Sequence, residues 1–232
     1  MKVLIKDQNE DTLKRGASPQ LIMEYQKLKE KIAYLKTNIE ADISRDGEIS
    51  YRAAARLTDG TFLPCVRFSN PETKIKSALE QFELVKAGKI HYYGIEDTPE
   101  QNFQKEVERI ITYGNRVNHY DIARIEPSPF AFPPGVLRQI GGETTMGYTG
   151  FAAQMRDGKY FGFGARNFDF EFFEMPEGYS PRDIIKIVSN AYVPKTGEVC
   201  NHQLGFLHNP PDFDQAGLHT SRLYFECFMD EL

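Results

Sequence analysis

Residues 51–68 read YRAAARLTDGTFLPCVRF, and this stretch decides the fold class. Apolar and polar side chains alternate before the pair Asp59-Gly60, and a second β-rich run comes after it. Asp-Gly between two such runs is the strongest short-range signal of a β-hairpin, because glycine adopts positive φ without a steric penalty from Cβ. Residues 151–165 have the same layout around Asp157-Gly158. The sequence therefore predicts two hairpins.

Outside the hairpins, the sequence marks the starts of four helices. A Ser, Thr or Asn followed directly by Pro precedes an apolar pattern of helical period at each of them. The side-chain oxygen of the first residue accepts from a free backbone N–H, and Pro fits the first helical position. The pairs are Ser18-Pro19, Asn70-Pro71, Thr98-Pro99 and Ser180-Pro181. We expect helices over about 19–43, 71–88, 98–114 and 181–191, and further strands over 89–95, 168–173 and 221–228.

Hairpins grouped in sequence, with helices between the groups, predict an α+β fold. We expect a mainly antiparallel sheet built from the two Asp-Gly hairpins, each followed by a helix, plus a long N-terminal helix. The prolines of residues 126–142 predict an extended connector without regular structure, pinned to the core by Phe130 and Phe132. The expected parts are an N-terminal arm and helix (1–46), a first half (47–125), this connector and a second half (143–232). Whether the connector separates two domains or crosses a single one stays open.

The long N-terminal helix carries a heptad pattern of apolar residues at alternating spacings of four and three. Its members are Leu21, Tyr25, Leu28, Ile32, Leu35 and Ile39. A stripe of this kind has to be buried, and two interpretations remain open. The stripe forms a coiled-coil contact with a second copy of the chain, or it packs along its own domain.

Composition limits the class of protein. The 232 residues can bury one good core or two small ones. Three cysteines at wide spacing do not make a disulfide framework, which suggests a reducing compartment. The apolar run at the N-terminus is too short for a signal peptide, and no stretch reaches the roughly 20 apolar residues that span a bilayer. We therefore expect a cytoplasmic protein that binds no membrane and holds no cofactor.

Two groups of residues are candidates for metal chemistry. Cys200, His202, His208 and His219 are zinc-type ligands, although their spacing lacks the close pairs of structural zinc sites. Asp169 and Glu171 lie on one face of an expected strand, about 7 Å apart. With Lys159 from the neighbouring strand they suit Mg²⁺- or Mn²⁺-dependent phosphodiester cleavage. Ordinary alternation of Phe and acidic residues along a half-buried strand explains the same pattern.

Arg52, Arg56 and Arg67 are expected on one face of the first hairpin and form a candidate nucleic-acid surface. The formal net charge of −5 argues against broad phosphate binding.

The leading functional hypothesis is an intracellular protein-interaction or assembly component that self-associates through the heptad helix. The alternatives are a metal-dependent, nuclease-like hydrolase and a nucleic-acid-binding accessory protein. Whether the protein is an enzyme stays open, because many active sites are assembled from residues scattered along the chain.

Overall fold

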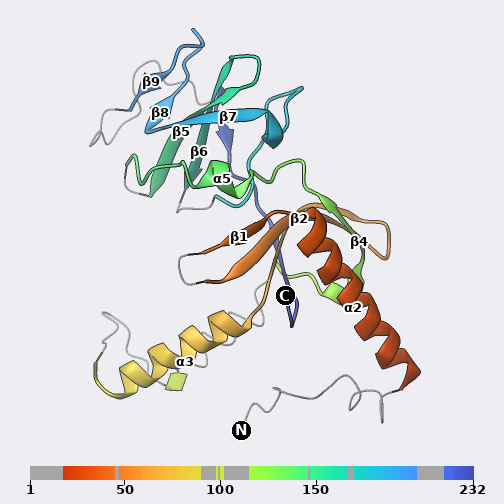
Figure 1. Cartoon of the computed structure of the whole chain (residues 1–232). Coiled ribbons are helices and arrows are strands. Elements are labelled where there is room, and N and C mark those ends of the chain that lie inside the picture. Colours follow the sequence, from red (N-terminus) through yellow and green to blue (C-terminus); the bar gives the residue numbers. More distant parts are fainter. Residues whose placement is uncertain are drawn as a thin grey trace.

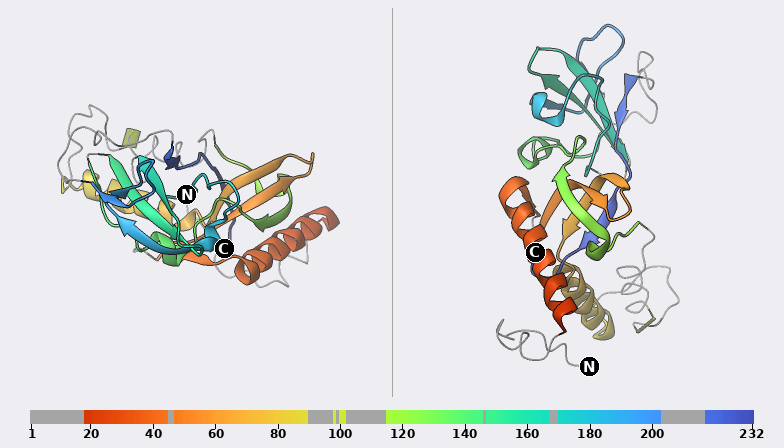
Figure 2. Two further views of the ribbon diagram at one scale, coloured as in Figure 1. Left: turned by 90° about the horizontal axis from the view of Figure 1, so that it is seen from above. Right: turned by 90° about the vertical axis from the view of Figure 1, so that its right-hand side faces the viewer.

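The computed structural model describes residues 18–44, 47–89, 98, 100–101, 115–145, 147–166, 170–202 and 217–232. It confirms a mixed α+β fold with mostly antiparallel strands and an N-terminal helix. Figure 1 shows two main sheets, one above the other, with α2 along one side of the lower sheet and α3 projecting below it. The second view in Figure 2 shows the same stacking from the side.

The elements have these bounds. The helices are α2 (Pro19–Asn38), α3 (Glu72–Lys86) and α5 (Pro134–Leu137), with 3-10 turns η1 (His119–Asp121) and η2 (Pro181–Asp183). The first sheet contains β1 (Ala41–Ile43), β2 (Ile49–Leu57), β3 (Phe62–Ser69), β4 (Ile122–Pro127) and β11 (Phe225–Phe228). The second sheet contains β5 (Tyr148–Met155), β6 (Tyr160–Arg166), β7 (Ile184–Ser189) and β10 (His219–Thr220). A short pair is formed by β8 (Ala191–Tyr192) and β9 (Cys200–Asn201).

Each sheet is centred on one antiparallel pair of neighbouring strands. β2 pairs with β3 around Gly60, whose φ is +91°, and β5 pairs with β6 around Gly158, whose φ is +90°. L-residues with a side chain rarely adopt such angles, so glycine suits both turns. The Leu57 N–H donates to the Thr61 carbonyl oxygen (2.8 Å), and the Met155 N–H donates to the Lys159 carbonyl oxygen (2.8 Å).

The core of the first sheet lies beneath α2. The side chain of Ser18 accepts from the Leu21 N–H and caps the helix. Below it, Leu28, Ile32 and Leu35 are buried against the sheet. Their partners in this cluster include Tyr51, Ala53, Ala55, Val66, Phe68, Ile122, Ile125, Cys227 and Met229.

The helix ends at Asn38, before the expected residue 43. Ala41–Ile43 instead form β1 and pair with residues 49–51 of β2, so sheet pairing overrides the helical period there.

The core of the second sheet is aromatic. Phe132, Phe151, Phe163 and Phe173 lie in mutual contact, with ring centroids 4.8–6.3 Å apart. Phe132 comes from the proline-rich stretch and is 1% exposed, so it does anchor that stretch to the core.

Regular structure does occur in residues 126–142, contrary to the prediction for this connector. Glu126 and Pro127 belong to β4, and Pro134 begins the four-residue helix α5. Pro134 occupies the first turn of that helix, where the missing N–H costs nothing.

The prediction of a helix after Ser180-Pro181 is wrong. Pro181–Asp183 form one 3-10 turn, and Ile184–Ser189 continue as strand β7, which pairs with β5. The capping box between Ser180 and Asp183 is present, but the adjoining run is rich in β-branched residues, which favour a strand.

The two sheets are interleaved along the chain. β11 follows the strands of the second sheet in the chain, yet it belongs to the first sheet, where it pairs in parallel with β3. The expected strand over 89–95 and most of the helix over 98–114 lie outside the described residues. Of the strand expected over 168–173, the described part forms one isolated bridge, from Phe173 to Ser221.

In the described part of the chain, no helix is long and apolar enough to cross a membrane.

Candidate binding groove between α2 and β4

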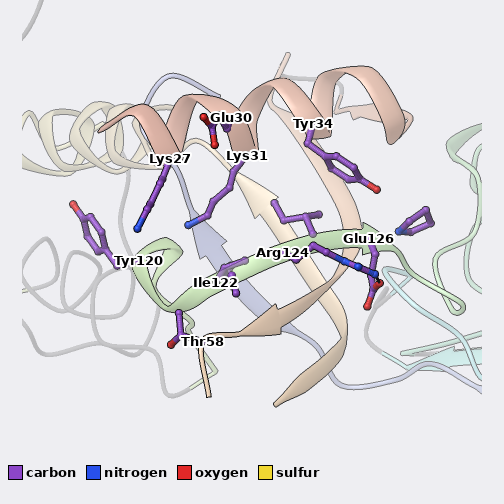
Figure 3. Close-up of a pocket in the computed structure, with 12 residues that line it drawn as sticks. Lys27, Glu30, Lys31, Tyr34, Thr58, Tyr120, Ile122, Arg124 and Glu126 are labelled. Atoms are coloured by element: carbon purple, nitrogen blue, oxygen red, sulfur yellow. Dashed lines mark hydrogen bonds and ion pairs between the residues drawn. The ribbon is translucent and has the colours of Figure 1, made fainter. Parts of the chain in front are cut away.

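A groove of about 930 Å³ lies along helix α2 and strand β4. Its volume lies within the roughly 300–1,000 Å³ that is usual for ligand sites. α2 supplies Lys27, Glu30, Lys31 and Tyr34 to its lining. Figure 3 shows α2 and β4 running side by side across the view, with Thr58 and Tyr120 at one end and Glu126 at the other.

The floor of the groove is the outer edge of β4. β4 pairs with β2 through one edge, in antiparallel register. Among the described residues no strand pairs with its other edge. An edge strand presents a row of backbone N–H and C=O groups that can pair with another chain. The groove therefore lies beside a sheet edge that can bind an extended segment.

Lys27 and Lys31 give the groove its positive side. Figure 3 shows both side chains extending from α2 toward β4. The Lys31 Nζ donates to the His119 carbonyl oxygen at 2.6 Å. Burial is the main cause that lowers the pKa of Lys31. The neighbouring charge of Lys27 also lowers it, whereas Cys227 and the Asp121 carboxylate act in the opposite direction. A negative group placed near both ammonium groups would relieve this repulsion.

The acidic residues of the lining do not neutralise the two lysines. Glu126 forms ion pairs with Arg124 and, at 3.5 Å, with Arg56. The hydrogen bond from Arg124 holds the pKa of Glu126 below its usual range. Glu30 is exposed, and its carboxylate stays close to the turn of α2 that carries it. The side of the groove between Lys27, Lys31 and β4 is therefore cationic.

The outer strand β7 of the second sheet is built differently. The outer edge of β7 lies next to α5 and the residues directly after it. The Ile187 N–H donates to Gln139 Oε1 (3.4 Å), and the Gly141 N–H donates to Ser189 Oγ (2.7 Å). Ser189 Oγ in turn donates to the Gln139 carbonyl oxygen (3.0 Å). Hydrogen bonds within the chain thus use one backbone N–H and one side chain of this strand.

The three arginines of the candidate nucleic-acid surface do share one face of the first sheet. Arg52 and Arg67 are direct cross-strand neighbours. Arg52 is buried and Arg67 is half-buried, and both pair with carboxylates, whereas Arg56 is exposed and contacts Glu126. The ion pairs are Arg52–Asp42 (3.4 Å), Arg52–Glu171 (4.0 Å), Arg67–Glu171 (3.3 Å), Arg67–Glu48 (3.3 Å) and Arg67–Glu226 (3.6 Å). We call this set the arginine–carboxylate network.

The candidate hydrolase residues fall into separate surroundings. Asp169 lies outside the described residues. Glu171 belongs to the arginine–carboxylate network. Lys159 lies in the β5–β6 turn, where it pairs with Asp157 at 3.6 Å and approaches the ring of Tyr179.

The candidate zinc ligands are also spread over different elements. Cys200 lies in β9 opposite Tyr192, and the His202 ring packs against Tyr148 and Tyr192. His219 lies in β10 opposite Phe163, and burial lowers the pKa of both histidines. His208 lies outside the described residues. Within the described ranges, no group of three or more His, Cys, Asp or Glu residues is arranged to hold a metal ion.

The heptad residues divide between the core and the surface. Leu28, Ile32 and Leu35 are buried in the core of their own chain, and Ile39 packs against that core. Leu21 is 53% exposed, and the Tyr25 hydroxyl donates to the Glu231 carboxylate at 3.1 Å. The central part of the heptad stripe therefore packs within its own chain, which is the second of the two interpretations of the sequence.

The groove was not identified by sequence reasoning. Lys27 and Lys31 have the spacing of groups on one helix face, which is a signal that the sequence contains. Their opposite wall, residues 122–127, carries no turn or cap signal of its own, and nothing local in the sequence brings it beneath α2.

Comparison with protein-family models, with curated proteins and with solved structures finds no match for this chain.

Proposed function

We propose that this protein is a protein-interaction component that binds an extended segment of a partner chain along the outer edge of β4. One observation carries the proposal: an edge without a strand partner among the described residues faces a groove of about 930 Å³. In strand addition of this kind, main-chain hydrogen bonds provide affinity and side-chain contacts provide specificity.

The length of the groove suits such a segment. β4 has six residues, and a strand rises about 3.3 Å per residue, so the edge is about 20 Å long. An added strand of similar length would have β4 on one side and the side chains of α2 above it.

The sequence of β4 limits nonspecific pairing. The strand carries the charged pair Arg124 and Glu126, ends at Pro127, and has an irregular register against β2 near Arg56. Charges, proline and bulges are the usual means by which proteins prevent edge-to-edge aggregation. A partner must therefore gain affinity from the groove as well as from the backbone of β4.

A second copy of the chain does not suit this edge. Antiparallel pairing of two β4 strands would put both α2 helices on the same face of the joined sheet. Because α2 packs over Ile122 and Ile125 and lines the groove beside β4, each helix would extend toward the space that the other needs above the paired strands, which lie about 4.8 Å apart. Packed helices need about 8–10 Å between their axes. A segment without its own covering helix fits instead.

The test selects binders for the full chain from a random peptide library and measures their affinity for two variants. Ala123 is exposed on β4 and lines the groove, so Ala123→Trp fills the groove without touching the core. Ala87, exposed after the end of α3, provides the matched control Ala87→Trp. We expect Ala123→Trp to weaken binding at least about tenfold, equivalent to roughly 1.4 kcal/mol, and Ala87→Trp to leave it unchanged. Selected peptides that bind wild type and Ala123→Trp equally would refute the proposal.

A further inference from the structure

The two lysines of the groove point into the space that an added strand would occupy. Lys31 uses one of its three N–H donors on the His119 carbonyl oxygen, which leaves donors for a second acceptor. Lys27 has no hydrogen-bond or ion-pair partner among the described residues of the groove. The Arg124 and Glu126 charges at the floor already satisfy each other. The lining carries three cationic and two acidic side chains, so its formal charge is positive, although Asp121 partly offsets Lys31 and the chain as a whole has a formal charge of −5.

The spacing of the two lysines matches the repeat of a strand. Residues four apart on a helix are separated by about 6 Å along its axis. Alternate residues of a strand, which lie on the same face, are separated by about 6.6 Å. Since α2 and β4 run side by side, two alternate side chains of an added strand would lie opposite Lys27 and Lys31.

We infer that the segment bound in this groove is acidic, with carboxylate side chains at alternate positions facing Lys27 and Lys31. The inference rests on the proposed function and names the chemistry of the partner. Each carboxylate would form a charge-assisted hydrogen bond in a partly enclosed site, where such bonds are stronger than on an open surface.

A polypeptide fits the groove better than a nucleic acid does. One wall offers backbone N–H and C=O groups of β4, which match another backbone in strand geometry. That wall also carries Glu126, and Glu30 lines the helix side. Nucleic-acid sites draw their affinity from more extensive positive surfaces and from aromatic stacking along the strand.

The experiment uses three peptides that carry the same N-terminal dye and differ only in charge. Their sequences alternate Val with Glu, Val with Gln or Val with Lys over six residues. Binding to the full chain is followed by fluorescence anisotropy, at low and at high salt. The test variant is Lys27→Glu, which alters an exposed residue of α2. Lys36→Glu makes the same charge change on an exposed residue of the same helix, outside the groove lining.

We expect wild type to prefer the Glu peptide to the Gln peptide, and high salt to reduce this preference. Lys27→Glu should weaken the Glu peptide about fivefold, equivalent to about 1 kcal/mol, and strengthen the Lys peptide. Lys36→Glu should change neither peptide by more than about twofold.

The possible results separate the inference from the proposed function. If all three peptides bind wild type equally and lose affinity in Ala123→Trp, the acidic-partner inference is refuted. The proposal that a strand binds along β4 would still hold. Failure of all three peptides, while library-selected peptides do bind in the groove, also refutes it. If the oligonucleotide (dT)₁₂ binds more tightly than the Glu peptide and weakens in Lys27→Glu, the groove binds nucleic acid, which contradicts both the inference and the proposed function.

Discussion

The two sheets protect their free edges in opposite ways. At β7, the Ile187 N–H donates to the Gln139 side chain, and the Ser189 hydroxyl accepts from the Gly141 N–H. At β4, the chain relies on charge, proline and the overhanging helix α2, and it leaves a groove beside the strand. The first solution covers part of an edge with another segment of the chain, whereas the second shields the edge from nonspecific partners. An edge of the second kind stays competent to bind, which is why the functional proposal rests on β4.

The cores beneath these edges differ as well. The first sheet uses small residues in β2, such as Ala53 and Ala55, so that α2 can approach closely. The second sheet fills its core with phenylalanine rings. The face of the first sheet opposite α2 holds the arginine–carboxylate network, whose Glu171 comes from the segment after β6.

The largest expected effect tests whether α2 is part of the first core. Leu28→Glu combined with Ile32→Glu puts two unpaired charges among buried apolar side chains, so we expect loss of folding. Circular dichroism and size-exclusion chromatography would show this. The matched control is Leu21→Glu with Met23→Glu, on side chains that are 53% and 52% exposed, and should fold normally. A folded, monomeric core double variant would show that the stripe instead forms a dimer contact.

The next effect concerns the aromatic core. Phe163 is fully buried among three other phenylalanine rings and the ring of His219, so Phe163→Ala should cost about 3–5 kcal/mol in free energy of unfolding. Ile185→Ala, on a residue of β7 that is 56% exposed, should cost under about 1 kcal/mol. Urea denaturation followed by circular dichroism measures both. Equal effects would mean that the core of the second sheet is not organised as described.

A smaller loss of stability is expected where Glu171, from the segment after β6, pairs with the arginines of the first sheet. Glu171→Gln removes a charge that contacts both Arg52 and Arg67, and should cost about 2 kcal/mol because other carboxylates of the network remain. Glu174 pairs with the more exposed Arg222, so Glu174→Gln should cost less than about 1 kcal/mol. Denaturation midpoints at pH 7 provide the comparison. An unchanged midpoint in Glu171→Gln would assign no stabilising role to this contact.

The smallest effect should be the same in both sheets. Gly60→Val and Gly158→Val each put a β-branched residue at a φ near +90°, which should cost about 1 kcal/mol or more. No atom lies within 4 Å of an added Cβ at either position, so the cost would come from the backbone alone. Thermal melting of the two variants would test this symmetry. Clearly unequal shifts would show that the two turns carry different strain.

Local signals in the sequence account for the parts of the fold that were predicted. The cap at Ser18 and the glycine positions at 60 and 158 depend on residues within one turn of the chain. At Ser180 the same type of signal misled, because a capping box is compatible with a single 3-10 turn, and the next residues determine whether a helix or a strand comes after it. There, pairing of Ile184–Ser189 with β5 overrode the helical spacing of the isoleucines.

The site depends on pairings that no local pattern encodes. Lys31 meets the His119 carbonyl oxygen across 88 positions of sequence, and β4 reaches α2 only because it pairs with β2. The arginines illustrate the same limit. Their shared face results from strand alternation, but their burial depends on Glu171 and Glu226, which come from distant segments. Residue type and spacing thus identified positively charged groups, but not whether they are available to a ligand.

The pairing of β11 with β3 has a consequence for biosynthesis. Ribosomes make the chain from its N-terminal end, so β3 is complete long before residues 225–228 exist. During that interval the edge of β3 that β11 will cover, next to Val66 and Phe68, has no native partner. Such long-range pairings fold slowly, and transiently uncovered strand edges are prone to aggregate. We therefore expect the nascent chain to depend on chaperones until β11 has left the ribosome.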